Sequence, residues 1–203
     1  KWSMVVDIDK CTGCQACVVA CQSENNIPIN TEDLFKQRRA IQWIRIERYW
    51  EGEFPNAKVR FIPLLCQHCD NAPCEPVCPV YATYHNQEGL NVQVYNRCIG
   101  SRLCVNNCPY HIRFFNFWEP NWPDSLKNQL NPDVTVRSRG IMEKCTFCIQ
   151  RISRTTRESK KNNQQVKDGD RRLNPACVNA CPTDALVFGD LNYVDPVTGE
   201  RSK

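Results

Sequence analysis

The stretch CTGCQACVVAC at residues 11–21 spaces four cysteines as C-x2-C-x2-C-x3-C. They are Cys11, Cys14, Cys17 and Cys21. Three thiolates this close together wrap one corner of an iron–sulfur cube, and in two-cluster ferredoxins the fourth cysteine reaches a second cube. The stretch therefore predicts that cluster-binding loops, rather than a large apolar core, organise the fold.

The cysteine groups form an internal repeat. Residues 98–108, CIGSRLCVNNC, repeat the first group with Ser101 in place of its second cysteine. Residues 71–79 (NAPCEPVCP) and 174–182 (NPACVNACP) are likewise copies, and their groups open with Cys66-x2-Cys69 and Cys145-x2-Cys148. A repeat of metal ligands implies repeated metal sites. The chain's 15 cysteines thus fill every position of four groups of four except one, which is occupied by Ser101.

The chemistry of these cysteines has three alternatives. Disulfides are disfavoured by the odd cysteine count and by the C-x2-C spacing. Zinc also binds C-x2-C pairs. Four cysteines in one x2-x2-x3 run, and a Cys-Pro ending that recurs at Pro79, Pro109 and Pro182, instead favour iron–sulfur clusters. Gly13 and Gly100 permit the tight turns that point amides at sulfide.

Composition excludes other classes. The net charge of +4 is too small to indicate a nucleic-acid-binding protein, and no basic stripe alternates with aromatic residues. No apolar run approaches the roughly 18 residues of a membrane-spanning helix. No Ser–His–Asp set, phosphate loop or pair of catalytic carboxylates is present, so no catalytic residue is expected and bond chemistry falls to partners.

Local patterns predict the elements around the cysteines. We expect strands at 3–8, 90–95 and 113–118, a short helix at 17–24, a hairpin at 41–50 and 58–65, and a loop at 119–133. The polar stretch 154–172 is expected to be a solvated excursion, helical near Arg151 and Arg154, or else a face that docks a partner.

The segments CTGCQACVVACQSEN, CPYHIRFFNF, EKCTFC and CVNACPTDAL resemble the four-cluster ferredoxin-type subunits of dimethyl-sulfoxide, polysulfide and nitrate reductases. The serine in the third group and the FWEPNW run are most similar to the iron–sulfur domain of alternative complex III, which is joined to a molybdopterin-enzyme-like domain. The resemblance covers most of residues 2–193. It implies an α+β fold of two ferredoxin-like βαβ units, each holding two clusters, with one unit inserted in the other. The outer unit would comprise 1–63 and 121–203, with a hairpin and a polar insertion, and the inner unit 64–120.

The resemblance also implies nested ligand sets, whereas spacing alone would equally allow the first group to pair with the second. Cluster 1 would be held by Cys11, Cys14, Cys17 and Cys181. Cluster 2 would be held by Cys21, Cys145, Cys148 and Cys177. Cluster 3 would be held by Cys66, Cys69, Cys74 and Cys108. Cluster 4 would be held by Cys78, Cys98 and Cys104, with Ser101 at the vacant corner.

The serine predicts three [4Fe-4S] clusters and one [3Fe-4S] cluster, because a cube iron without a thiolate is easily lost. A serine alkoxide or a water that retains the fourth iron is the alternative. His68 is expected to hydrogen-bond near its cluster. The resemblance implies that a three-iron cluster of this kind lies near the quinone end of the wire. His111 and Arg113 either approach this cluster or form surface hydrogen bonds. Trp118 and Trp122 either pack on a membrane subunit or shield a cluster from water.

Three functions remain open at this point. The first is an electron wire in a quinol:acceptor oxidoreductase of the alternative complex III type. The second is the same wire in a molybdenum reductase, and the third is clusters that serve only as structural staples. The resemblance implies a membrane quinol-binding subunit, a molybdopterin-enzyme-like partner and a haem or copper carrier. It also implies a peripheral position on the periplasmic face of the bacterial cytoplasmic membrane.

Overall fold

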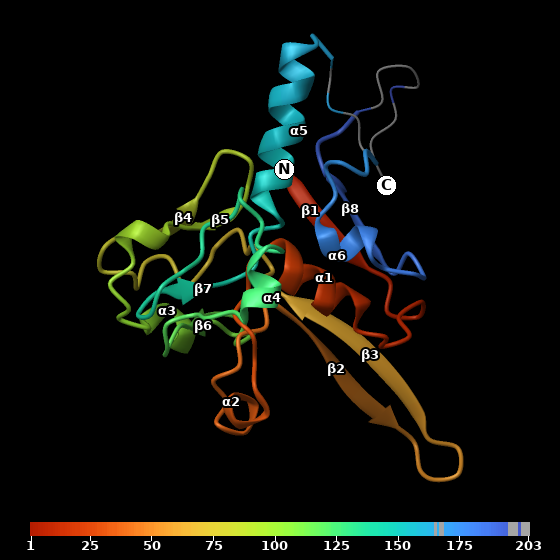
Figure 1. The fold of residues 1–203 in the computed structure, drawn as a ribbon. Helices are drawn as coiled ribbons and strands as arrows, with labels where there is room; N and C mark the ends of the chain where they lie inside the picture. Colours follow the sequence, from red (N-terminus) through yellow and green to blue (C-terminus); the bar gives the residue numbers. More distant parts are fainter. Residues whose placement is uncertain (165, 167–168, 195–198, 200–203) are drawn as a thin grey trace. The chain divides into compact units, whose positions relative to one another are not determined.

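The computed structural model of the protein describes residues 1–164, 166, 169–194 and 199. Within them, short helices alternate with eight strands that pair into four separate two-stranded sheets, an α+β arrangement (Figure 1). The strands are β1 (Trp2–Val6), β2 (Ile44–Glu51), β3 (Lys58–Leu65), β4 (Thr83–His85), β5 (Asn91–Gln93), β6 (Phe114–Phe115), β7 (Met142–Glu143) and β8 (Leu186–Asp190). The helices are α1 (Ala16–Glu24), α2 (Glu32–Lys36), η1 (Tyr95–Arg97), α3 (Leu103–Asn106), α4 (Asp124–Lys127), α5 (Ile149–Lys161) and α6 (Ala176–Asn179).

The chain forms two compact units, each made of several segments. Unit 1 comprises residues 1–17, 46–63 and 147–203, and unit 2 comprises residues 18–45 and 64–146. The predicted division into an outer and an inner cluster-binding unit at 63/64 and 120/121 stays a prediction, because a compact unit need not coincide with a cluster-binding unit.

Unit 1 is built on an antiparallel ladder between the two ends of the chain. Strand β1 pairs with β8 from Trp2 opposite Asp190 to Val6 opposite Leu186. Phe188 stacks on Trp2, with ring centroids 5.6 Å apart, and meets Phe147 edge-on at 5.3 Å. These aromatic contacts anchor the ladder to the segment that begins α5.

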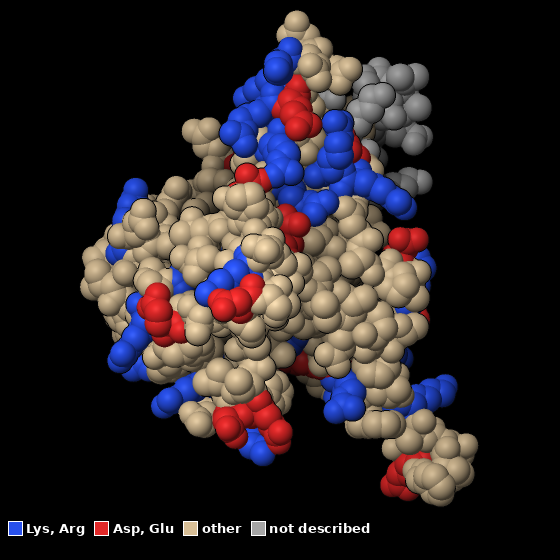
Figure 2. Space-filling model, viewed as in Figure 1, with Lys and Arg blue, Asp and Glu red and all other residues tan. Residues whose placement is uncertain are grey.

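Helix α5 carries the first part of the predicted polar excursion. It runs without interruption over 13 residues, longer than the local helix expected near Arg151 and Arg154. Ile152, Thr155 and Ser159 form its buried face, and Lys and Arg side chains gather along its length in Figure 2. Residues 165 and 167–168 of the excursion lie outside the described residues.

Unit 2 contains two ladders that hold cysteine loops. Strand β4 pairs antiparallel with β5, from Thr83 opposite Gln93 to His85 opposite Asn91. Strand β6 pairs antiparallel with β7, with Phe114 opposite Glu143. The predicted strands at 90–95 and 113–118 are therefore present but shorter, and the expected loop at 119–133 contains one helical turn, α4. The predicted helix at 17–24 and the hairpin at 41–65 are confirmed as α1 and as β2–β3.

A buried charge pair stabilises unit 2. The Glu143 carboxylate accepts hydrogen bonds from Arg137 Nη2 at 3.0 Å and from Trp43 Nε1 at 3.1 Å, and also from the Asn116 amide. Both charged side chains are completely buried. The Arg137 guanidinium also lies 5.0 Å from the centroid of the Trp43 ring, so the cation is enclosed by one carboxylate and an aromatic face.

None of the helices among the described residues is both long and apolar enough to cross a membrane.

The substitution Glu143→Gln should destabilise unit 2. It leaves the buried Arg137 guanidinium without its counter-charge, and breaking a buried ion pair from one side costs about 3–5 kcal/mol. We expect a lower thermal unfolding midpoint at unchanged iron content. The double variant Arg137→Met/Glu143→Gln removes both charges and should recover part of the loss. A double variant less stable than Glu143→Gln would contradict the pairing.

Candidate iron–sulfur centres

All four cysteine groups open with the same backbone turn. The residue two places after the first cysteine has a positive φ in every group: Gly13 (+70°), His68 (+44°), Gly100 (+74°) and Phe147 (+52°). Successive N–H groups around a left-handed residue form a concavity that binds anions, and many iron–sulfur sites use it. His68 and Phe147 adopt this conformation despite the cost that a Cβ carries there, about 1–2 kcal/mol.

The loop around Ser101 keeps the backbone of the loop around Cys14. After Gly13 and Gly100, the next left-handed residues are Gln15 (φ +62°) and Arg102 (φ +61°), which follow Cys14 and Ser101 directly. Both loops lead into a helix, α1 or α3. The serine therefore replaces a thiol at an otherwise unchanged loop.

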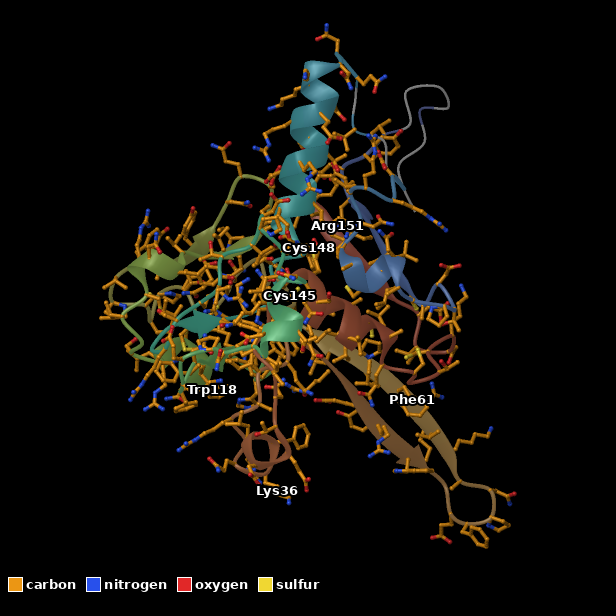
Figure 3. The ribbon with its side chains drawn as sticks, viewed as in Figure 1. Lys36, Phe61, Trp118, Cys145, Cys148 and Arg151 are labelled. Atoms are coloured by element: carbon orange, nitrogen blue, oxygen red, sulfur yellow. The ribbon has the colours of Figure 1, made fainter. Side chains whose placement is uncertain are left out.

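Glycine is required at positions 13 and 100 by the neighbouring atoms as well as by the positive φ. A Cβ on Gly13 would lie 2.6 Å from the ring of Phe61, which Figure 3 labels on β3. A Cβ on Gly100 would lie 2.4 Å from the carbonyl oxygen of Gly140, a backbone atom that cannot rotate away. Both contacts are far shorter than van der Waals separation, so no larger residue fits at either position.

A second turn follows each Cys-Pro pair. The third residue after Cys78, Cys108 and Cys181 is left-handed in each case, namely Tyr81 (+51°), His111 (+49°) and Asp184 (+50°). This turn directs the amide of Ala82 to Cys78 Sγ at 3.1 Å and that of Ala185 to Cys181 Sγ at 3.3 Å.

These amides favour the thiolate form. Partial burial raises the pKa of the Cys78 and Cys181 thiols, but backbone amides two, four and five residues further along outweigh it and hold each pKa below its usual value. The donors lie at identical offsets in the two copies. The sequence repeat thus also repeats the hydrogen bonds to sulfur. These bonds stabilise the negative charge that a thiolate carries when it ligates iron.

In unit 2 the structure brings together the members of the third expected set. Burial raises the pKa of the Cys69 thiol, and the nearby thiols of Cys66 and Cys108 raise it further. The pKa of Cys74 is also raised, by burial and by the same two neighbours. Four thiols in this space repel one another once ionised, so a bound cationic iron core would relieve that repulsion.

The members of the fourth expected set also lie close together. Burial raises the pKa of Cys104, and the nearby thiols of Cys98 and Cys78 add to the increase. Cys74 and Cys104 share one buried apolar group, against which Cys69 and Cys98 pack. The third and fourth sets are therefore neighbours within unit 2. No three described His, Cys, Asp or Glu side chains converge closely enough to hold a single metal ion.

In unit 1 the ladder β1–β8 places the first group near Cys181. Strand β1 leads into the loop of Cys11, β8 follows the turn after Cys181, and the Asp7 amide donates to the Ala185 carbonyl at 2.8 Å. The ladder β4–β5 relates Cys78 to Cys98 in the same way. The members of the second expected set are divided between the two units; Cys145 and Cys148 flank the turn into α5 (Figure 3).

Ser101 borders a cavity of about 390 Å³ in unit 2. Its lining includes the guanidinium groups of Arg39 and Arg102 and the rings of Phe115 and Phe117. Arg102 lies over Phe115 at 5.2 Å and Arg39 over Phe117 at 4.9 Å. The loop that lacks a cysteine is thus exposed beside a cationic, aromatic surface.

The other residues that the sequence marks as candidates differ in how exposed they are. His111 is exposed, whereas Arg113 is 4% exposed, so a surface role for Arg113 is wrong. His68 Nδ1 accepts from the Asn91 amide at 3.1 Å, and burial, reinforced by the charges of Lys144, His85 and Arg113, lowers its pKa so that it stays neutral. Trp122 is buried and Trp118 is half-buried.

Comparisons with known proteins also indicate iron–sulfur clusters. A 4Fe-4S dicluster domain family matches residues 10–82, and a second family of the same description matches residues 57–122. The iron–sulfur cluster-binding subunit of menaquinone reductase from Nitratidesulfovibrio vulgaris is 44% identical over 95% of this chain and 76% of its own length.

Two further relatives are similar over nearly the whole chain. Iron–sulfur subunit 1 of an Hdr-like menaquinol oxidoreductase from Archaeoglobus fulgidus is 38% identical over 94% of this chain and 71% of its own length. The iron–sulfur subunit of arsenate respiratory reductase from a Shewanella species is 36% identical over 95% of this chain and 82% of its own length.

The substitution Gly100→Ala should disrupt the loop around Ser101. Gly140→Ala is the matched control, because Gly140 also has a positive φ (+89°) but nothing lies within 4 Å of its added Cβ. The control should lose only the conformational cost of about 1–2 kcal/mol. Gly100→Ala adds a backbone clash, so its thermal midpoint should fall further and its iron content should drop. Equal midpoints for the two variants would show that the close approach to Gly140 is unimportant.

Proposed function

The chain belongs to the ferredoxin-type iron–sulfur subunits of menaquinone, dimethyl-sulfoxide and arsenate reductases, and we propose that it conducts single electrons between a quinone site on a membrane partner and a second redox partner. Iron–sulfur clusters supply the one-electron exchange. The chain's own residues hold them, donate hydrogen bonds to their thiolates and keep them at fixed separations. The observation that carries the proposal is the four-fold repeat of amide-lined cysteine loops.

We propose the nested ligand sets as the arrangement of the sites. The closeness of Cys66, Cys69, Cys74 and Cys108 supports the third set, and that of Cys78, Cys98 and Cys104 supports the fourth. The ladder β1–β8 supports placing Cys181 with Cys11, Cys14 and Cys17. The second set, Cys21, Cys145, Cys148 and Cys177, then follows as the remaining cysteines.

We further propose that the centre at Ser101 is a [3Fe-4S] cluster and the other three are [4Fe-4S] clusters. Ser101 stands on the same loop backbone as Cys14, so the missing ligand is a matter of chemistry rather than of loop shape. A hard serine oxygen is a poorer iron ligand than a thiolate. Loss of one iron changes the cluster's charge, which is a main determinant of its reduction potential.

The chain's place in its complex has two candidates. The first is the alternative complex III type. There a peripheral, periplasmic wire takes electrons from a membrane quinol site and passes them, beside a molybdopterin-enzyme-like domain, to a haem or copper carrier. The second is a wire that delivers electrons to the quinone, which the 44% identity to a menaquinone reductase subunit favours. In both, the centre at Ser101 is the quinone end.

A redox-poised EPR series on the intact complex, with iron, labile sulfide and molybdenum counted, tests these proposals. Reversible reduction of four centres would support the wire. Stoichiometric molybdenum would move the assignment to the wire of a molybdenum reductase, the second of the open functions. Clusters that neither reduce nor oxidise reversibly would leave only structural staples. Colourless protein containing zinc would overturn the assignment altogether.

The substitution Ser101→Cys should convert the centre at Ser101. A thiolate at this corner completes the first-group pattern, so the near-isotropic EPR signal of an oxidised three-iron cluster should disappear and the iron content should rise by one atom per chain. Ser101→Ala, the control, should keep the signal of the wild type. A wild type without that signal would instead indicate that Ser101 or a water retains the fourth iron, and an alanine variant that gains the signal would identify Ser101 as the ligand.

A further inference from the structure

Unit 2 buries two positive charges that no carboxylate neutralises. Arg113 is 4% exposed and Lys144 is completely buried. Neither side chain has a carboxylate oxygen within 4 Å among the residues that the structure describes. Taking an unpaired charge out of water costs several kcal/mol, so each cation needs a counter-charge that the protein chain does not supply as Asp or Glu.

Arg113 is held by neutral groups and faces thiols. Its Nη1 donates to Gln93 Oε1 at 2.9 Å, and its Nη2 donates to Thr83 Oγ1 at 2.6 Å and to Asn91 Oδ1 at 2.8 Å. The anionic groups that act on it are the thiolates of Cys74, Cys104 and Cys66, and Cys104 also accepts a hydrogen bond from it. These cysteines belong to both the third and the fourth proposed sets.

Lys144 is likewise held by neutral groups, and it lies beside Cys145, a member of the second proposed set. Its Nζ donates to the carbonyl oxygen of Cys145 at 2.8 Å and to that of Asn91. Burial lowers the pKa of Lys144, and the thiolates of Cys66, Cys145 and Cys74 are the negative groups that oppose this shift and favour the charged form. Asn91 therefore links the two cations, and its amide nitrogen lies 3.8 Å from Cys74 Sγ.

Two comparisons within the chain indicate that these charges are not needed to form the cysteine loops themselves. Arg137, the third buried cation in unit 2, is neutralised by Glu143 in the usual way. The residue before the first cysteine is Lys144 in the fourth group but Leu65 in the second, and both are buried. The repeat therefore forms with an apolar residue at this position, and the charge of Lys144 is an addition.

We propose that Arg113 and Lys144 are positioning residues whose fixed charges raise the reduction potentials of the centres that face them. This inference rests on the proposed function and its ligand sets. Reduction adds an electron, and a buried positive charge stabilises the more negative state strongly because little water screens it. Arg113 acts on the Cys66–Cys69–Cys74–Cys108 centre and on the Ser101 centre, whereas Lys144 acts on the former and on the Cys145 centre.

The test is a redox-poised EPR titration of the intact complex with three variants. Arg113→Gln removes the charge but keeps hydrogen-bonding atoms, and Arg113→Lys retains the charge. Lys144→Leu installs the residue of the other repeat copy. The signal that changes in Ser101→Cys identifies the Ser101 centre in every sample. Iron and labile sulfide are counted in each, so that loss of a cluster is not mistaken for a shifted potential.

The expected result is a pattern specific to each cation. Arg113→Gln should lower the midpoint potentials of the Ser101 centre and of one four-iron centre, and Arg113→Lys should restore most of the loss. Lys144→Leu should lower two four-iron centres and leave the Ser101 centre unchanged. Arg97→Gln, which removes an exposed charge one residue before Cys98, should shift the Ser101 centre less than Arg113→Gln because water screens it.

Unchanged potentials in Arg113→Gln and Lys144→Leu, at full iron and sulfide content, would overturn this inference and leave the electron wire intact. An equal shift of all four centres would overturn it too, since it would indicate general loosening of the fold. If Arg113→Gln does not assemble, Lys144→Leu decides alone, because the buried Leu65 of the other copy shows that the turn accepts an apolar side chain. Protein without redox-active iron would instead overturn the proposed function.

Discussion

Mutual repulsion among crowded thiolates is the constraint on which this structure depends. Fifteen cysteines in 203 residues become anionic when they bind iron, and like charges at such density are unfavourable unless something opposes them. Backbone N–H groups are the first feature of the fold that opposes this repulsion. Left-handed residues at the same offset in each loop form concavities lined by backbone N–H groups, and the turns after Cys78 and Cys181 direct backbone amides to sulfur. Two-stranded ladders of two to five residue pairs then suffice to hold these loops in place.

Much of the fold could be predicted from the sequence where local signals are strong. Helix α1 and the hairpin β2–β3 follow from apolar and β-branched runs between turn residues. Strand β8 was not predicted, because its partner β1 lies at the other end of the chain and five residues carry no periodicity of their own. The full length of helix α5 was not predicted, because its buried face consists of Ile152, Thr155 and Ser159, which do not form an apolar stripe in the sequence.

The cysteines could be predicted as candidate ligands from their spacing alone, whereas their division into four ligand sets remains a proposal. The buried cations could not, because composition does not distinguish a buried lysine or arginine from a surface one. One signal was available: Lys144 aligns with Leu65 in the repeat, and a charge aligned with a buried apolar residue marks an unusual environment. Arg113 offered no such signal, because its hydrogen-bond partners Thr83, Asn91 and Gln93 lie on strands β4 and β5, whose pairing only the structure supplies.

The same cations bear on whether clusters in such a protein are wires or staples. Within the described residues, every buried Lys or Arg lies in unit 2, and the negative groups that act most strongly on Arg113 and Lys144 are cysteine thiolates. Without a cluster these thiols are protonated when burial raises their pKa, as at Cys74 and Cys104, and the cations then lose their counter-charge. Iron binding releases those protons and supplies the missing negative charge, so metal binding and folding are coupled. On the proposal that the cations also raise the potentials, one electrostatic arrangement both stabilises the folded unit and favours the reduced centre. Structural and redox roles of the clusters would then be two consequences of the same charges rather than alternatives.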